Sequence, residues 1–239
     1  MCTVSYIPLA GDDFILTSNR DETPLRKTIP PETYTENGLQ ITYPKDKLAG
    51  GTWVGVSSYQ RVICLLNGAF EKHKREKCYR LSRGVVVKNL LTCDDVMKEI
   101  ESFDYNGIEP FTLISIDWKK DRIAHEFVWD GKTKHVRELD TEPHIWSSSP
   151  LYDADMKKER HSWFEEFTET NQPLSQESLL KFHQSERQED RKNSIRMKRL
   201  FVETVSTTSI SKKGKEIDLR YFDYLNEANT KQMKLEILQ

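Results

Sequence analysis

The sequence has few of the features that mark membrane, secreted or nucleic-acid-binding proteins. Its longest apolar runs, such as residues 85–87, are far too short to cross a bilayer. The 36 basic and 38 acidic residues nearly cancel to a formal net charge of −2, so no overall field favours nucleic acid or an anionic membrane. The first residues lack the basic segment and apolar stretch of a signal peptide. These absences favour a cytoplasmic protein that makes no membrane insertion and binds no nucleic acid.

Cysteine and histidine patterns are also sparse. The four cysteines are Cys2, Cys64, Cys78 and Cys93, and no two of them form a C-x-x-C pair. The six histidines are scattered, without an H-E-x-x-H or zinc-finger spacing. We therefore expect free thiols in a reducing compartment and no bound metal or other cofactor.

The chain opens with a hairpin pattern. Residues 2–8 alternate in polarity, which is typical of a strand, and 14–16 are a nearly all-apolar second strand. Gly11 and the two aspartates after it form a turn signal between the strands. A turn centred there makes the numbers of paired residues sum to about 22 or 23, which places Cys2 opposite Arg20 and Asp21. The polar run 19–22 is therefore expected beside the start of the chain.

Cys2 itself has two interpretations. A residue this small normally allows the initiator Met1 to be removed, which would leave a thiol and a free α-amine on one residue. An N-terminal amine has a pKa of about 8 and can accept a proton near neutral pH. Such an amine can activate its own side chain as a nucleophile. The alternative is that Cys2 is a small apolar residue at the start of a buried strand.

The middle of the chain contains a second hairpin. Residues 23–48 include four prolines and predict a long ordered surface loop. Residues 50–56 and 62–68 then predict two strands joined by a turn near Tyr59 and Gln60, with Thr52 pairing close to Asn67. Asn67 and Gly68 suit an oxyanion hole, and they equally suit an ordinary turn. The basic run 72–77 predicts a solvated loop.

The remaining pattern alternates helices with strands. Helices are expected over 79–91, 94–103, 151–168 and 175–185, and strands over 111–118, 122–129, 135–139, 203–210 and 216–221. Residues 145–150 predict a small-residue bend, and the tail from 226 is polar and poorly specified. Tight turns join most strands, which indicates largely antiparallel sheets. The whole chain, 1–239, is expected to be one domain of the α/β (α+β) class, a layered sandwich.

Several motifs occur together in a particular order. They are Met1-Cys2, then Ser18-Asn19-Arg20-Asp21-Glu22, then Gly50-Gly51-Thr52-Trp53-Val54-Gly55, then Asn67, then Ser82-Arg83-Gly84. The set resembles the NRDE family, named for the Asn-Arg-Asp-Glu run and also called the transport and Golgi organisation protein 2 family. The resemblance covers most of the chain, with weaker motifs at 129–131, 146–149 and 204–210.

The resemblance implies the N-terminal-nucleophile hydrolase fold, a four-layer αββα sandwich. It also implies relatives such as penicillin V acylase and bile salt hydrolase, whose cysteine attacks an amide carbonyl. Carried over, Cys2 is the nucleophile in cleavage of a non-peptide C–N bond of a small acyl-amide. Asp21 holds the amine or thiol in position, and Arg20 favours the thiolate. Asn67 and Ser149 donate to the oxyanion, and Asn19 belongs to the same conserved run.

The same resemblance leaves a second function open. The chain departs from the hydrolase pattern at Ser18, Ser149 and Val205, where the related proteins carry Arg, Asn and Arg. The eukaryotic branch of the family is linked to haem and to acyl-CoA or lipid, so a non-catalytic carrier on the same scaffold is the alternative. Trp53, Phe70 and Trp146 are either the lining of an acyl pocket or ordinary packing. A homo-oligomer is also compatible with the sequence.

Overall fold

The computed structural model describes residues 2–236, apart from the side chain of Cys2. These residues form two compact units, the first made of residues 2–26 and 141–236 and the second of residues 27–140. The single domain expected from the sequence stays a prediction. Over the described residues, no helix is both long and apolar enough to span a bilayer.

The first unit contains a six-stranded antiparallel sheet in the order β10-β1-β2-β11-β12-β13. Its strands are β1 (Cys2–Pro8), β2 (Phe14–Glu22), β10 (His144–Ser147), β11 (Glu203–Lys213), β12 (Glu216–Asp223) and β13 (Lys231–Glu236). A short 3-10 helix, η1 (Glu227–Asn229), precedes β13. β2 lies in the middle of the sheet, and its first eight residues are all buried.

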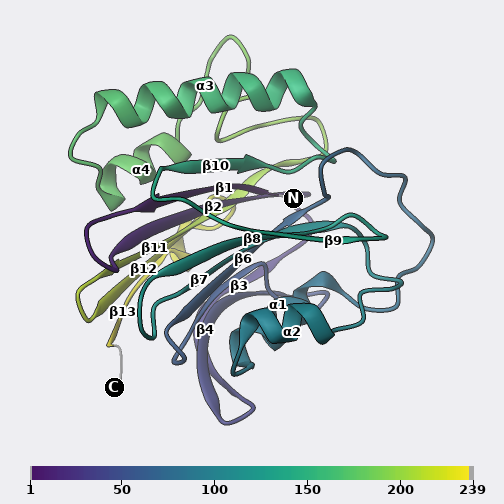
Figure 1. Ribbon diagram of the computed structural model, residues 1–239. Helices are drawn as coiled ribbons and strands as arrows, with labels where there is room; N and C mark the ends of the chain where they lie inside the picture. The colour runs from purple at the N-terminus through teal and green to yellow at the C-terminus, as the bar shows by residue number, and fades with distance from the viewer. Residues whose placement is uncertain (1, 237–239) are drawn as a thin grey trace. The chain divides into compact units, whose positions relative to one another are not determined.

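Helices α3 (Ala154–Thr170) and α4 (Gln176–His183) cover one face of this sheet (Figure 1). The side chains of Asp153 and Ser175 cap the two helices by accepting hydrogen bonds from first-turn N–H groups. Phenylalanines of both helices pack on Ile7 and Ile15, which point from β1 and β2 towards the helices. Alternation along the strands therefore assigns Thr3, Ser5 and Ile7 to this helix-covered face.

The second unit contains a seven-stranded antiparallel sheet with its strands in chain order. The strands are β3 (Thr28–Glu36), β4 (Leu39–Asp46), β5 (Val54–Ser57), β6 (Arg61–Asn67), β7 (Phe111–Asp117), β8 (Ile123–Trp129) and β9 (Lys134–Glu138). Helices α1 (Arg83–Thr92) and α2 (Val96–Ser102) bury their apolar residues with those of the sheet in one core. Each unit thus has one helix layer and one sheet layer.

The glycine-rich motif of the second unit lets two backbone segments, at Gly51 and at Gly84, lie in close contact. A Cβ atom on Gly51 would lie 2.9 Å from the Cα of Gly84, and a Cβ on Gly84 would lie 2.9 Å from the backbone N of Thr52. The first turn of α1 can therefore approach the 51–52 segment only because both residues are glycine. The Thr52 hydroxyl lies within hydrogen-bonding distance of the carbonyls of Pro44 and Val54.

Two expectations about secondary structure are wrong, and one strand lies where no element was predicted. Residues 23–48 are not one loop, because β3 and β4 form a hairpin there. Residues 145–147 of the expected bend belong to strand β10, which pairs with β1. The polar tail contains β13, which pairs with β12.

The other elements are confirmed to within a few residues, and so is the α/β (α+β) class with largely antiparallel sheets. None of the cysteines whose side chains are described, Cys64, Cys78 and Cys93, forms a disulfide. Residues 72–77 form no helix or strand, as expected.

Candidate functional site

The β1–β2 hairpin has the expected register. Cys2 pairs with Arg20, and the pairing continues to Pro8 with Phe14. Gly11, in the connecting turn, has a φ of 64°, a left-handed conformation that favours glycine. The backbone at Cys2 therefore lies beside the Asn19–Asp21 run, as predicted, although the Cys2 side chain is outside the described part of the chain.

Alternation along β2 divides the run between the two faces of the sheet. Asn19 and Asp21 hydrogen-bond to groups of the helix layer, whereas Arg20 points to the opposite face. Arg20 is 4% exposed, and its Nη1 donates to the carbonyl of Arg26 at 3.1 Å. A β-bulge in the partner strand β11 lets Thr204 pair with Asp21 while Ser206 pairs with Arg20.

Asp21 is a buried carboxylate with two hydroxyl donors. Tyr152 Oη donates to its Oδ2 at 2.9 Å, and Thr204 Oγ1 donates to its Oδ1 at 2.7 Å. Burial raises the pKa of Asp21, although the Thr204 hydrogen bond and the charge of Arg160 oppose the shift. The two hydroxyls hold the carboxylate in one position at the end of the sheet where the chain begins.

Arg160 on α3 connects the neighbouring strands. It is fully buried and donates to Ser147 Oγ, to Thr3 Oγ1 and to the carbonyls of Asn193 and Ser194. Its guanidinium also lies over the Tyr152 ring, 4.1 Å from the centroid. The sequence analysis missed Arg160, although its spacing with Phe164 and Phe167 follows the buried stripe of the helix.

Asn19 is held by four hydrogen bonds. Its Nδ2 donates to the carbonyls of His183 and Ile195 at 2.8 and 3.0 Å. Its Oδ1 accepts from Thr207 Oγ1 at 2.7 Å and lies 3.1 Å from His183 Nδ1. These bonds use the full capacity of the amide, so Asn19 fixes β2 to α4 and to the 193–195 segment.

His183 lies between Asn19 and Ser5 as a neutral side chain. Because Asn19 Oδ1 can only accept, Nδ1 carries the proton, and Nε2 accepts from the Ser5 hydroxyl at 2.6 Å. Burial and the charge of Arg160 lower the pKa of His183 to about 3. No sequence motif marks His183, because its partners are more than 160 positions away.

Ser149 follows β10, the strand that pairs with β1. It is 5% exposed, and its Oγ accepts a hydrogen bond from Lys157 Nζ at 3.0 Å. Lys157 lies one turn before Arg160 on α3. Lys157 donates to Ser149, and Arg160 donates to Ser147. The hydroxyl of the neighbouring Ser148 is buried without a hydrogen-bond partner among the described residues.

The face that carries Arg20 also holds unpaired hydroxyls. Ser18, Ser206 and Thr208 are buried, and their hydroxyls find no hydrogen-bond partner among the described residues. Ser18 pairs with Thr208, and Arg20 with Ser206, so the four side chains are neighbours on one face. Val205, where the resemblance suggests an arginine, is the buried extra residue of the bulge.

Asn67 belongs to the second unit, so its predicted position near Cys2 stays a prediction. It ends β6 and pairs with Phe111. Gly68 follows with a φ of 84°, and its N–H donates to the Pro110 carbonyl at 2.9 Å. That N–H is therefore already used, and the side-chain amide of Asn67 is the donor that the hypothesis needs.

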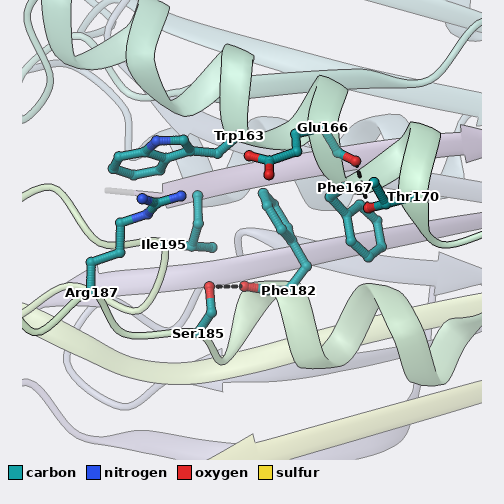
Figure 2. Close-up of a pocket in the computed structure, with 8 residues that line it drawn as sticks. All are labelled: Trp163, Glu166, Phe167, Thr170, Phe182, Ser185, Arg187 and Ile195. Atoms are coloured by element: carbon teal, nitrogen blue, oxygen red, sulfur yellow. Dashed lines mark hydrogen bonds between the residues drawn. The ribbon is translucent and has the colours of Figure 1, made fainter.

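A pocket of about 190 Å³ lies between α3 and α4 in the first unit (Figure 2). Its lining residues are Trp163, Glu166, Phe167, Thr170, Phe182, Ser185, Arg187 and Ile195. The Arg187 guanidinium lies 3.9 Å from the centroid of the Trp163 ring and forms one wall. None of the predicted site residues lines this pocket. Among the described residues, no group of three or more His, Cys, Asp or Glu side chains could hold a metal ion.

Three solved structures show the same fold. An N-acylethanolamine-hydrolyzing acid amidase ortholog from Caenorhabditis elegans matches 87% of this chain and 92% of its own, with 14% identity and a TM-score of 0.61. The C2A mutant of conjugated bile acid hydrolase from Clostridium perfringens matches 99% and 92%, with 9% identity and a TM-score of 0.57. Penicillin V acylase from Agrobacterium tumefaciens matches 99% and 91%, with 11% identity and a TM-score of 0.52.

No curated protein matches the sequence. The family model for transport and Golgi organisation 2 does match, over residues 1–227. The resemblance drawn from the NRDE run is therefore confirmed, and so is the fold that it implies. The chain belongs to the transport and Golgi organisation 2 family and has the N-terminal-nucleophile hydrolase fold.

Proposed function

We propose that this protein is a cytoplasmic cysteine hydrolase that cleaves the C–N bond of a small acyl-amide. Cys2 is the nucleophile, and its α-amine, freed by removal of Met1, is the base. The observation that carries the proposal is the pairing of Cys2 with Arg20 next to a buried, doubly hydrogen-bonded Asp21. Amide hydrolysis by the solved relatives supports the choice of reaction, and their low identity leaves the substrate to experiment.

Two charged groups activate and position the Cys2 nucleophile. Arg20 is directly opposite Cys2 in the strand pairing, and a nearby guanidinium lowers the pKa of a thiol. Asp21 lies on the other face of the sheet and anchors the α-amine. Asn19 and Arg160 are positioning residues, because their hydrogen bonds fix β1, β2 and β10 to the helices.

The reaction follows the usual course of covalent amide hydrolysis. The α-amine takes the thiol proton, and the thiolate sulfur attacks the amide carbonyl carbon, whose π electrons move to oxygen. When the tetrahedral intermediate collapses, the C–N bond breaks and the leaving nitrogen takes the proton from the α-ammonium. Water then attacks the thioester, which releases the carboxylic acid and regenerates the thiol.

The oxyanion of this intermediate needs hydrogen-bond donors. Ser149 is one, because a hydroxyl can donate its own proton as well as accept from Lys157. The side-chain amide of Asn67 is the second. Lys157→Met is expected to lower kcat and leave KM nearly unchanged, because the lysine acts through Ser149 on the transition state.

A panel of N-acyl amides with varied acyl chains and amine groups tests the activity. The wild-type protein is expected to release amine from at least one of them, and Cys2→Ala is expected to abolish that release. Cys78→Ser is the matched control, because it removes an exposed thiol and should keep full activity. Equal activity of Cys2→Ala and the wild type would contradict the proposal.

The carrier function is the alternative outcome of the same experiment. The buried hydroxyls of Ser18, Ser206 and Thr208 favour it, because they have no hydrogen-bond partner within residues 2–236 as described and can bind a polar group without any chemistry. If the panel shows no turnover and the purified protein carries haem or an acyl compound, the scaffold is a carrier. Ultraviolet–visible spectroscopy and mass spectrometry of a denatured sample distinguish the two ligands.

A further inference from the structure

Two large apolar side chains form the tip of a tight turn in the first unit. Residues 199–202 close with a hydrogen bond from the N–H of Arg199 to the carbonyl of Val202, at 2.8 Å. The antiparallel bridge between Lys198 and Glu203 continues the turn into β11. Leu200 and Phe201 occupy the two central positions and are 86% and 76% exposed. We call residues 199–202 the tip.

The residues at the tip are unusual for such a turn. The central positions of tight turns normally hold Gly, Asn, Asp, Ser or Pro, for reasons of backbone geometry and hydrogen bonding. Leucine and phenylalanine offer neither advantage, and here neither packs into a core. Exposed apolar side chains gathered in one place on a soluble protein indicate a surface that binds something.

A third exposed apolar side chain lies at the same end of the sheet. Leu25 is 87% exposed and sits in the turn that follows β2. Glu22, the last residue of β2, pairs with Glu203, the first residue of β11. The turn that holds Leu25 and the tip are therefore neighbouring connections. Leu25, Leu200 and Phe201 lie at the same end of the sheet.

Basic residues predominate in the segment that leads into the tip, and two of them form ion pairs, Lys198 with Glu203 and Arg196 with Glu186. Residues 190–200 include five basic residues and one acidic residue, in a chain whose overall net charge is −2. The N–H of Lys198 donates to the carbonyl of Arg191, and Arg199 Nε donates to the carbonyl of Lys192. These bonds hold the exposed Arg191 and Lys192 beside the base of the tip.

We propose that the tip docks on an anionic lipid bilayer, with Leu200 and Phe201 inserted among the headgroups and the cations facing lipid phosphates and carboxylates. Apolar side chains beside basic ones are the chemistry that binds such surfaces. A second copy of the chain is disfavoured, because a two-fold contact would bring the same cations face to face. The docking stands independently of the proposed hydrolase activity.

Vesicle co-sedimentation tests the docking. The wild-type protein should pellet with phosphatidylcholine vesicles that contain phosphatidylserine, and much less with phosphatidylcholine alone. Raising the salt concentration should release it, because salt screens the attraction between charges. The double variant Leu200→Ser/Phe201→Ser and the double variant Arg191→Gln/Lys192→Gln should each bind at least about tenfold more weakly.

Leu48→Ser is the matched control. Leu48 is 84% exposed in a turn of the second unit, so its change removes a leucine as exposed as Leu200 without touching the tip. It should bind vesicles like the wild type. All of the substituted side chains are exposed, and unchanged melting temperatures would show that the variants remain folded.

Phe201→Trp gives a second measurement that does not depend on loss of binding. Its added tryptophan fluorescence should shift to shorter wavelength with anionic vesicles, whereas that of Leu48→Trp should not. Docking is refuted if the wild type fails to pellet with anionic vesicles or if the serine double variant pellets equally well. It is also refuted if the wild type is a dimer that the serine double variant converts to monomer.

Discussion

Tyr152 donates a hydrogen bond to Asp21 across 131 positions of sequence, at 2.9 Å and away from solvent. This contact joins the start of α3 to the end of β2, beside the strand that begins at Cys2. It holds Asp21, an acidic residue of the NRDE run, in one position as a buried hydrogen-bond acceptor. The proposed function depends on that fixed position, and the first prediction concerns its charge.

Asp21 is expected to make stability fall as pH rises. Because burial raises its folded-state pKa above 3.8, the folded protein holds the proton more tightly than the unfolded chain. The contribution of Asp21 is therefore greatest below pH 3.8 and is lost as pH rises through the raised pKa. Asp21→Asn keeps a hydrogen-bonding side chain and removes this titration. Urea unfolding across acidic pH measures the difference, and curves that run parallel for both proteins would contradict the assignment.

His183 is expected to have the opposite effect. Its folded-state pKa is lowered from 6.5 to about 3, so the unfolded chain takes up a proton that the folded protein does not. Stability is fully present above pH 6.5 and falls towards pH 3, by up to roughly tenfold in the folding equilibrium per pH unit. His183→Gln should flatten this acid slope even if it lowers stability at neutral pH. Urea unfolding across acidic pH measures the slope, and an unchanged slope in His183→Gln would contradict the assignment.

Arg160→Met is expected to destabilise the protein by about 3 kcal/mol or more, because it leaves buried acceptors without donors. Arg160→Lys should not restore the loss, since an ammonium group cannot reproduce the fork of a guanidinium. Chemical denaturation gives both values. Lys158→Met, at an exposed position on the same helix, should change stability by less than about 0.5 kcal/mol. Equal effects of Arg160→Met and Lys158→Met would show that the buried hydrogen bonds contribute little.

Gly84→Ala is expected to destabilise the second unit by about 1–3 kcal/mol, because the new methyl group meets the backbone of Thr52 and Gly51. In an unobstructed helix the same change would stabilise by about 1 kcal/mol. The sign of the change in melting temperature therefore decides whether the two glycines are in contact. A higher melting temperature for the alanine variant would contradict the packing.

The register of the first hairpin could be predicted because a glycine turn and strict alternation determine it locally. Four strands could not be predicted, and three of them are edge strands: β3, β10 and β13; the fourth, β4, lies between β3 and β5. An edge strand is paired on one side only, so it tolerates polar residues and proline that would exclude a central strand. Pro30 and Pro31 lie at the irregularity between Ile29 and Glu32 of β3, where the ladder is interrupted.

The Asn-Arg-Asp-Glu run could be located from the sequence, but the roles of its members could not. Asn19, Arg20 and Asp21 are adjacent in sequence, yet alternation sends Arg20 to one face and the other two to the helices. The partners that define those roles, His183, Arg160 and Tyr152, come from segments more than 130 positions away. No local pattern in the sequence reveals such pairings.

Mass spectrometry of thiol labelling tests the central claim, that Cys2 is an activated N-terminal nucleophile. The intact mass should lack Met1, and limited iodoacetamide at neutral pH should modify Cys2 before the exposed Cys78 and the buried Cys64. Arg20→Gln should slow the labelling of Cys2 and leave that of Cys78 unchanged. Retention of Met1, or labelling of Cys2 no faster than that of Cys78, would contradict the account.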